Sequence, residues 1–412
     1  MLKYDKDVKN ALDRLEKAGF PAYATGDCFL SMILGEDALD WELLTTADAG
    51  ELKTLFPEVE DPGDGTGSRQ MSFRDDEVLL DITPAPAGIE AALRSRTFTL
   101  EAVAENPERG VLDPCGGMKD IRNRLIKTTG DPEEQFRRDP DMMMRALRYV
   151  SELGFDLSRD VFEAIRNHYM ELAENPTPDT CVELELLMGG AHAGKALAML
   201  ADTGLLAAVY GPEVFRKMSG NDQERYTTLV EKIDETQRVP LRRIGMLYAI
   251  LEDIRGSRAL RQLPFDEEDM VHLDDAVNML LDLQFINDKV RLKQMIAQIG
   301  WNRFNYLHNL NKASRIVFDR ASFKIEAMNM MLRDIRSNGE AVLVSDLVID
   351  ANDILDAGIT DDPELANRLL EDVLAKVHKD PRNNVREPLL RLAKKYKRNP
   401  LASKTRYVRW IH

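Results

Sequence analysis

Two patterns of hydrophobic and polar residues divide the chain. Up to about residue 125, short apolar runs alternate with helical segments, which predicts an amphipathic helix over 4–18 and strands over 40–46 and 77–83. After residue 131, apolar positions recur with the 3.6-residue period of helices, and prolines punctuate them. The sequence therefore predicts an α+β fold, in which a small mixed-sheet head precedes an elongated all-helical neck, body and tail.

The same pattern predicts where these parts begin and end. Within the head, residues 93–105 are expected to be helical. Arg137 and Arg138 are expected to begin the helix that carries Arg145 and Arg148 on one face. We expect four segments along the chain: a mixed-sheet head (1–130), a helical neck (131–205), a helical body (206–325) and a helical tail (326–412).

Three carboxylates in the head are candidates for a metal site. Asp40 and Glu42 lie two residues apart on one predicted strand, so they project to the same face, and a neighbouring strand could bring Asp81 beside them. Clustered carboxylates ionise together only when a cation joins them. Mg²⁺ bound by carboxylates and triphosphate oxygens would suit nucleotidyl transfer. The alternative is that these acidic residues at strand ends are simply solvated.

The order of several segments resembles that of the tRNA nucleotidyltransferase (CCA-adding) and bacterial poly(A) polymerase family, which has a polymerase-β-like head. Each segment alone is weakly specific, but the set follows the family's order over nearly the whole chain. The segments are 25–31, 40–42, 77–83, 95–101, 111–126, 138–148, 193–212 and 349–370.

The resemblance implies a function and a set of site residues. It implies Mg²⁺-dependent addition of nucleotides from ATP or CTP to the 3′ end of an RNA, and tRNA is the RNA that the resemblance favours. The metal and catalytic residues would be Asp40, Glu42 and Asp81, and the nucleotide-binding residues would be Gly26, Arg96, Asp139, Arg145 and Arg148.

Several family positions are altered in this chain. Asp27 places an anion where the family has a second glycine beside the triphosphate, and Leu30 stands in place of a cation. Met142 replaces the arginine that would read a nucleobase with Asp139, and a methionine cannot donate a hydrogen bond. We therefore expect impaired or altered catalysis. A catalytically silent relative that binds RNA or a protein through its helices remains open, so whether the chain is an enzyme is undecided.

Charge and composition bear on the cellular location of the protein and on where it could bind RNA. The formal net charge is −16, but residues 371–412 carry +8, so the rest carries −24. Three scattered cysteines, no apolar run long enough to cross a membrane and no apolar signal core favour a cytoplasmic location without membrane attachment. The basic C-terminus is either a solvated helix or an RNA contact. The RNA-binding candidates there are Lys394, Lys395, Lys397 and Arg398.

Overall fold

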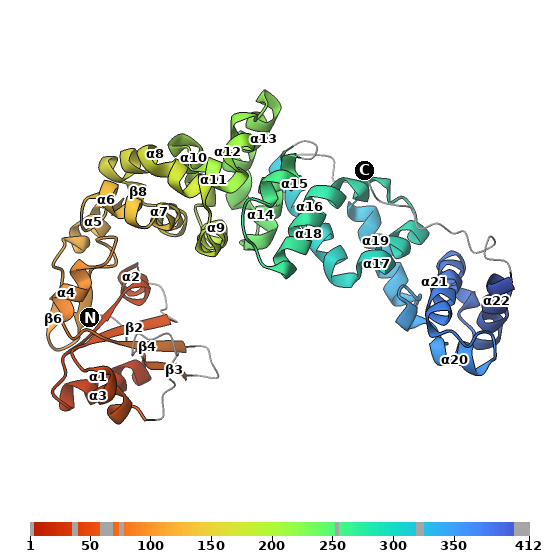
Figure 1. Cartoon of the computed structure of the whole chain (residues 1–412), viewed down its shortest axis with the longest axis horizontal. Helices are drawn as coiled ribbons and strands as arrows, with labels where there is room; N and C mark the ends of the chain where they lie inside the picture. Colours follow the sequence, from red (N-terminus) through yellow and green to blue (C-terminus); the bar gives the residue numbers. More distant parts are fainter. Residues whose placement is uncertain are drawn as a thin grey trace. The chain divides into compact units, whose positions relative to one another are not determined.

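The computed structural model describes residues 4–34, 40–57, 69–73, 78–251, 255–318 and 325–398 (Figure 1). By packing, the chain forms two compact units. The first comprises Met1–Glu183 and Gly190–Ala208, and the second comprises Leu184–Gly189 and Val209–His412. The finer division into head, neck, body and tail stays a prediction.

A mixed six-stranded sheet forms the head in the first unit. Its strand order is β3-β4-β2-β1-β5-β6, with β2 and β4 parallel and the other pairs antiparallel. The predicted α+β class is confirmed. The strands are β1 (Ala22–Thr25), β2 (Asp40–Thr45), β3 (Arg69–Phe73), β4 (Val78–Pro84), β5 (Ala104–Asn106) and β6 (Gly110–Leu112), and the head helices are α1 (Lys6–Lys17), α2 (Asp27–Leu34), α3 (Ala49–Leu55), α4 (Ile89–Arg94) and α5 (Gly117–Asn123).

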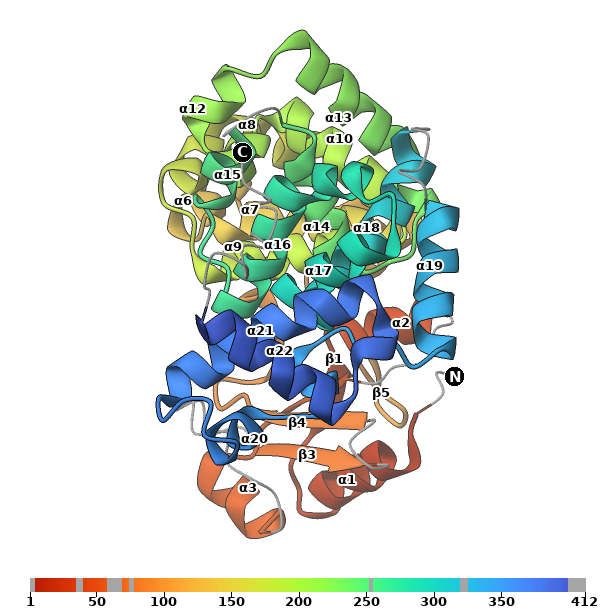
Figure 2. The same ribbon diagram turned by 90° about the vertical axis from the view of Figure 1, so that its right-hand side faces the viewer.

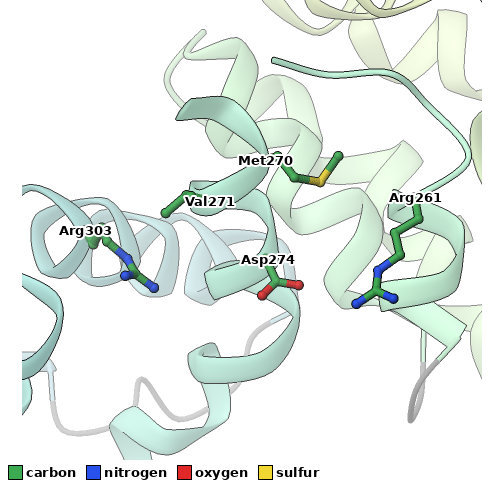
Figure 3. A pocket seen from close by; sticks show the side chains of 5 residues that line it. All are labelled: Arg261, Met270, Val271, Asp274 and Arg303. Atoms are coloured by element: carbon green, nitrogen blue, oxygen red, sulfur yellow. The ribbon is translucent and has the colours of Figure 1, made fainter. Parts of the chain in front are cut away.

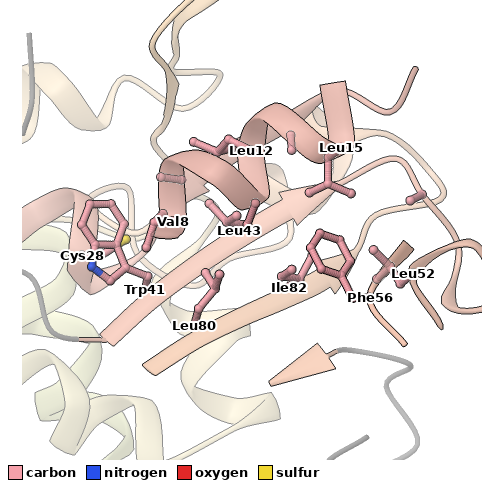
Figure 4. Close-up of a cluster of buried hydrophobic side chains, with 14 of the residues drawn as sticks. Val8, Leu12, Leu15, Cys28, Trp41, Leu43, Leu52, Phe56, Leu80 and Ile82 are labelled. Atoms are coloured by element: carbon pink, nitrogen blue, oxygen red, sulfur yellow. The ribbon is translucent and has the colours of Figure 1, made fainter. Parts of the chain in front are cut away.

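Helices α1 and α3 cover one face of this sheet (Figure 4). Val8, Leu12 and Leu15 of α1 are buried against Leu43 of β2 and Leu80 of β4. Because side chains alternate along a strand, this burial assigns residues 42 and 81 to the opposite face of the sheet. The apolar core therefore determines where the polar face of the two central strands lies.

Helices follow the head in the first unit. A short parallel pair, β7 (Leu125–Ile126) with β8 (Asp156–Leu157), joins the end of the head to the loop after α7. Met142, Met143 and Met144 of α7 are all buried, so this methionine run packs in the core. The helices are α6 (Pro132–Arg138), α7 (Asp141–Leu153), α8 (Arg159–Glu174), α9 (Pro178–Gly189), α10 (Ala193–Thr203) and α11 (Leu206–Tyr210), of which α9 and α11 continue into the second unit.

The described part of the second unit is entirely helical. Near its end, α21 and α22 pack side by side around Leu370, Val373 and Leu389 (Figure 2). Within the described residues, no helix is both long enough and apolar enough to cross a membrane. The α-helices are α12 (Pro212–Arg216), α13 (Gly220–Lys232), α14 (Pro240–Ala249), α15 (Arg255–Leu260), α16 (Glu267–Met279), α17 (Lys289–Ile299), α18 (Trp301–Phe318), α19 (Ile325–Ser337), α20 (Ala351–Asp356), α21 (Pro363–Lys379) and α22 (Arg386–Arg398).

Two sequence predictions are wrong. The helix expected over 93–105 ends with α4 at Arg94, because residues 97–99 are extended and hydrogen-bond to 127–129. Arg137 and Arg138 end α6 and do not begin α7. Pro140 disfavours helical backbone at the preceding residue, which separates the two helices there.

Candidate functional site

A glycine turn and the strand beside it begin the candidate site. Gly26 follows β1 with a φ of +72°, a conformation that side chains with a Cβ rarely adopt. Thr25 pairs with Glu42 across the sheet, and a Cβ on Gly26 would lie 2.7 Å from the Glu42 Oε2. The positive φ therefore favours a glycine here, and a Cβ at this position would displace the Glu42 carboxylate, which is the end of a flexible side chain.

Glu42 and Asp81 lie opposite each other on the parallel strands β2 and β4. Leu43 and Leu80 are buried on the α1 face, so the two carboxylates belong to the other face. Asp40 starts β2 with its backbone paired to Leu79, but its side chain lies outside the described residues. Among the described side chains, no group of three His, Cys, Asp or Glu is placed to hold a metal ion, so the predicted trio stays a prediction.

Arg96 forms an ion pair with the Glu42 carboxylate. Its backbone is fixed by the extended segment that replaces the expected helix: the Thr129 N–H donates to the Thr97 carbonyl at 2.9 Å, and the Thr99 N–H donates to the Lys127 carbonyl at 2.8 Å. These bonds attach residues 97–99 to the strand-like segment at the end of the head. The guanidinium of Arg96 thereby reaches the acidic face of β2.

Helix α7 brings a second arginine to the glycine turn. The Arg148 Nη1 lies 3.6 Å from the Asp27 Oδ2, and its guanidinium lies 4.4 Å from the centre of the Tyr149 ring. The Tyr149 hydroxyl donates to the Glu101 Oε1 at 2.6 Å and lies 3.5 Å from the Asp27 Oδ1. Asp27, which the resemblance marks as a departure, is therefore held by helix α7.

Buried carboxylates surround the arginines of α7. The nearly buried Glu183 accepts from the Arg145 Nε at 2.7 Å and lies 3.0 Å from the Arg148 Nε. Glu152 lies 3.4 Å from the Arg148 Nη1. Burial raises the pKa of Glu152 to about 7 despite this pairing, and burial also raises the pKa of Glu101.

The expected nucleotide-binding residues are thus already engaged by protein groups. Arg96 is paired with Glu42, Arg145 with Glu183, and Arg148 with Asp27 and two other carboxylates.

Four of the carboxylates and Tyr149 were not predicted from the sequence as parts of this site. One sequence signal could have pointed to them: the helical period of α7 places charged and polar residues at buried positions, and such residues need polar partners. The missed residues are Asp27 as a pairing group, Glu101 as a bonded carboxylate, Tyr149, Glu152 and Glu183.

The remaining predicted residues do not join this cluster. Asp139 lies at the end of α6, and Met142 is buried, so the position of the family's base-reading arginine is part of the core. The basic residues Lys394, Lys395, Lys397 and Arg398 lie on α22 in the second unit, where the Lys397 ammonium donates to the Ile359 carbonyl.

A surface cavity of about 410 Å³ lies in the second unit (Figure 3). Arg261, Asp274 and Arg303 line it together with the apolar Met270 and Val271. Arg303 is paired with the buried Asp275, so its charge is already neutralised. This cavity brings together none of the residues that the sequence singled out.

The fold of this chain is similar to that of several solved proteins. The fold, a mixed sheet followed by helices, matches that of solved CCA-adding enzymes. The Bacillus stearothermophilus enzyme in complex with CTP matches with a TM-score of 0.68 at 22% identity, over 97% of this chain and all of that one. The Thermotoga maritima enzyme complexed with tRNA matches with a TM-score of 0.60 at 18% identity, over 95% of each chain.

Sequence relatives agree with this fold. The CCA-adding enzyme of Geobacillus stearothermophilus is 33% identical over 221 residues, which is 50% of this chain and 55% of that protein. That of Geobacillus kaustophilus is 34% identical over 213 residues, which is 48% and 53%. No family model matches the chain. The resemblance seen in the sequence is confirmed: the chain is a relative of the tRNA nucleotidyltransferases, although it spans only about half the length of the curated relatives it matches.

Proposed function

We propose that this chain is a template-independent nucleotidyltransferase that acts on an RNA 3′ end, with tRNA as its substrate. The observation that carries the proposal is the placement of Glu42 and Asp81 opposite each other on parallel strands, beside the turn at Gly26. Relatives over half of the chain are CCA-adding enzymes, and similar folds have been solved with CTP, ATP and tRNA.

The carboxylates fit a hard divalent cation. Glu42 and Asp81, with Asp40 as the third ligand, would hold Mg²⁺ through oxygen atoms, the ligand type that this ion prefers. When bound, the ion would stabilise charge on the attacking and leaving oxygens of the nucleotidyl transfer. Glu42 is engaged by Arg96 in the structure, so the two roles compete for one carboxylate.

The chain's own residues supply positioning. Gly26 leaves its turn without a side chain, which lets a phosphate approach the backbone. Arg96 would transfer from Glu42 to a phosphate oxygen, because a guanidinium binds either anion through the same fork of N–H donors. With Met142 buried in the core, discrimination between bases by that position is lost, so we propose weak selection between ATP and CTP.

A catalytically silent RNA-binding relative is the second candidate. It is favoured by one specific observation at the turn. Asp27 adds an anion that repels phosphate, where the family's glycine would not, and it also engages Arg148, which could otherwise bind phosphate. The basic face of α22 would then be the main RNA contact. Replacing Lys394 and Lys395 with alanine should lower the salt dependence of tRNA binding in either candidate.

An incorporation assay distinguishes the candidates. The full chain is given Mg²⁺, labelled CTP or ATP, and tRNA lacking its terminal CCA, and the Asp81→Asn and Glu42→Gln variants are compared with Glu90→Gln. Glu90 is an exposed carboxylate on α4 and serves as the matched control. Incorporation that is lost in the first two variants and kept in the third supports catalysis. No incorporation and no nucleotide binding by the unmodified chain would leave only the silent candidate.

A further inference from the structure

A groove between α18 and α19 in the second unit has properties of a ligand site. Its volume is about 530 Å³, which falls in the range of small-molecule sites. Both walls are helical and lie entirely within the second unit, so the groove does not depend on the head.

The charges lining the groove are predominantly positive. Lys312, Arg333 and Arg336 line it, with Glu326 as the carboxylate among the lining residues. In the described part of the chain, no carboxylate lies within ion-pair distance of Lys312 or Arg333, and Arg336 lies over the Trp301 ring at 5.3 Å. The groove thus concentrates cations in a chain whose net charge is −16.

Other cations near the groove, in the same unit, form ion pairs with carboxylates. Lys289 pairs with Asp334 and Glu340, and the buried Lys293 pairs with Glu340 at 2.6 Å. Arg303, at the other end of α18, pairs with Asp275. Among the residues that the structure describes, the cations that line the groove therefore lack the carboxylate partners that Lys289, Lys293 and Arg303 have, and their charge favours an anionic occupant.

Hydrogen-bond donors add to this charge. The Asn329 Oδ1 lies 2.8 Å from the Nε2 of the buried His308, and burial lowers the pKa of that imidazole, so it is neutral and donates from Nε2. With its oxygen occupied, Asn329 offers its amide N–H groups to the groove. Met330 and Leu332 supply an apolar surface for the uncharged part of a ligand.

We propose that this groove binds a phosphorylated small molecule of mononucleotide size, with the phosphate held by Lys312 and Arg333 and the remainder placed against Asn329 and Met330. Cations and N–H donors converging on a bounded volume suit a phosphate ester. An extended RNA strand would be followed by a longer stripe of cations and by stacked aromatic side chains.

The test is calorimetric titration of the full chain with AMP, inorganic phosphate and adenosine. We expect AMP to bind, inorganic phosphate to compete and adenosine to bind more weakly. The Lys312→Ala/Arg333→Ala variant should lose at least about tenfold in AMP affinity, which corresponds to about 1.4 kcal/mol. Arg315→Ala is the matched control, because Arg315 is exposed on the same helix but does not line the groove.

Titrations run without Mg²⁺ and repeated with Asp81→Asn separate this groove from the head. Equal AMP affinity in the double variant and the unmodified chain would overturn the proposal, as would failure of both AMP and phosphate to bind. Binding of an RNA oligonucleotide that requires Lys312 and Arg333, without any binding of AMP or phosphate, would also overturn it in favour of a nucleic-acid surface. Circular dichroism of each variant establishes that the exposed substitutions leave the fold intact.

Discussion

Replacing Asp27 by glycine should strengthen nucleotide binding at the head. Asp27 is the first residue of α2, and its carboxylate lies 3.6 Å from the Arg148 guanidinium. Its side chain is 59% exposed, so this ion pair stabilises the fold by only about 0–1 kcal/mol. The free energy of unfolding should therefore fall by no more than about 1 kcal/mol.

The effect on a bound triphosphate should be larger. Two like charges about 4 Å apart repel by about 1 kcal/mol in water and by about 4 kcal/mol at the effective dielectric constant near a protein surface. With solvent screening of the exposed Asp27, we expect removal of its charge to gain about 1–2 kcal/mol, or roughly 5–30-fold in affinity. Release of Arg148 from Asp27 adds to this gain in the same direction.

The measurement is the dissociation constant of ATP or CTP in the presence of Mg²⁺, for the unmodified chain, Asp27→Gly and Asp27→Asn. The asparagine variant keeps the side chain and removes its charge, so it separates repulsion from the space that a Cβ occupies. The gain should shrink as salt rises, because screening weakens the repulsion that the substitution removes. Equal or weaker binding by both variants would refute the reasoning that Asp27 opposes phosphate.

Three further predictions concern the buried groups around α7. Tyr149→Phe removes the donor to the buried Glu101, so the free energy of unfolding in urea should fall by about 1.5–3 kcal/mol. Glu183→Ala leaves the charge of Arg145 without its partner and should cost about 3–5 kcal/mol in the same assay. Because the folded pKa of Glu152 is raised to about 7, its contribution to stability is present below about pH 4.5 and lost as pH rises towards 7. Glu152→Gln should therefore flatten the loss of stability between these pH values, and an unchanged pH profile would contradict the assigned pKa.

Local patterns in the sequence were sufficient for the fold class and for the strand faces that carry Glu42 and Asp81. Residues two apart on a strand share a face, and the apolar residues between them define which face is buried, so alternation alone places Glu42 and Asp81 on the face opposite the buried leucines. The parallel pairing that sets the two carboxylates opposite each other comes from tertiary packing. The helical remainder follows from the 3.6-residue period. Strand alternation and the helical period are both properties of short segments and need no knowledge of distant contacts.

The partners of these carboxylates could not be predicted in this way. Arg96 meets Glu42 across 54 positions of sequence, through a segment that helical propensity alone assigns wrongly. Glu183 meets the arginines of α7 across 38 positions, from a different helix. Such pairings depend on tertiary packing, which overrides local propensity. The break between α6 and α7, by contrast, had a local signal, which is the effect of Pro140 on the residue before it.

The structure changes the meaning of the altered family positions. Asp27 is not an isolated loss, because its carboxylate meets Arg148 of α7, and the next residue of that helix, Tyr149, donates to the buried Glu101. Arg96 is likewise neutralised by Glu42, which is itself a candidate metal ligand. Any nucleotide that binds here must therefore exchange ion pairs within the protein for ion pairs with phosphate. A divalent cation on Glu42 would favour that exchange by competing with Arg96, so phosphate affinity and metal affinity should rise together, and Glu42→Gln should uncouple them.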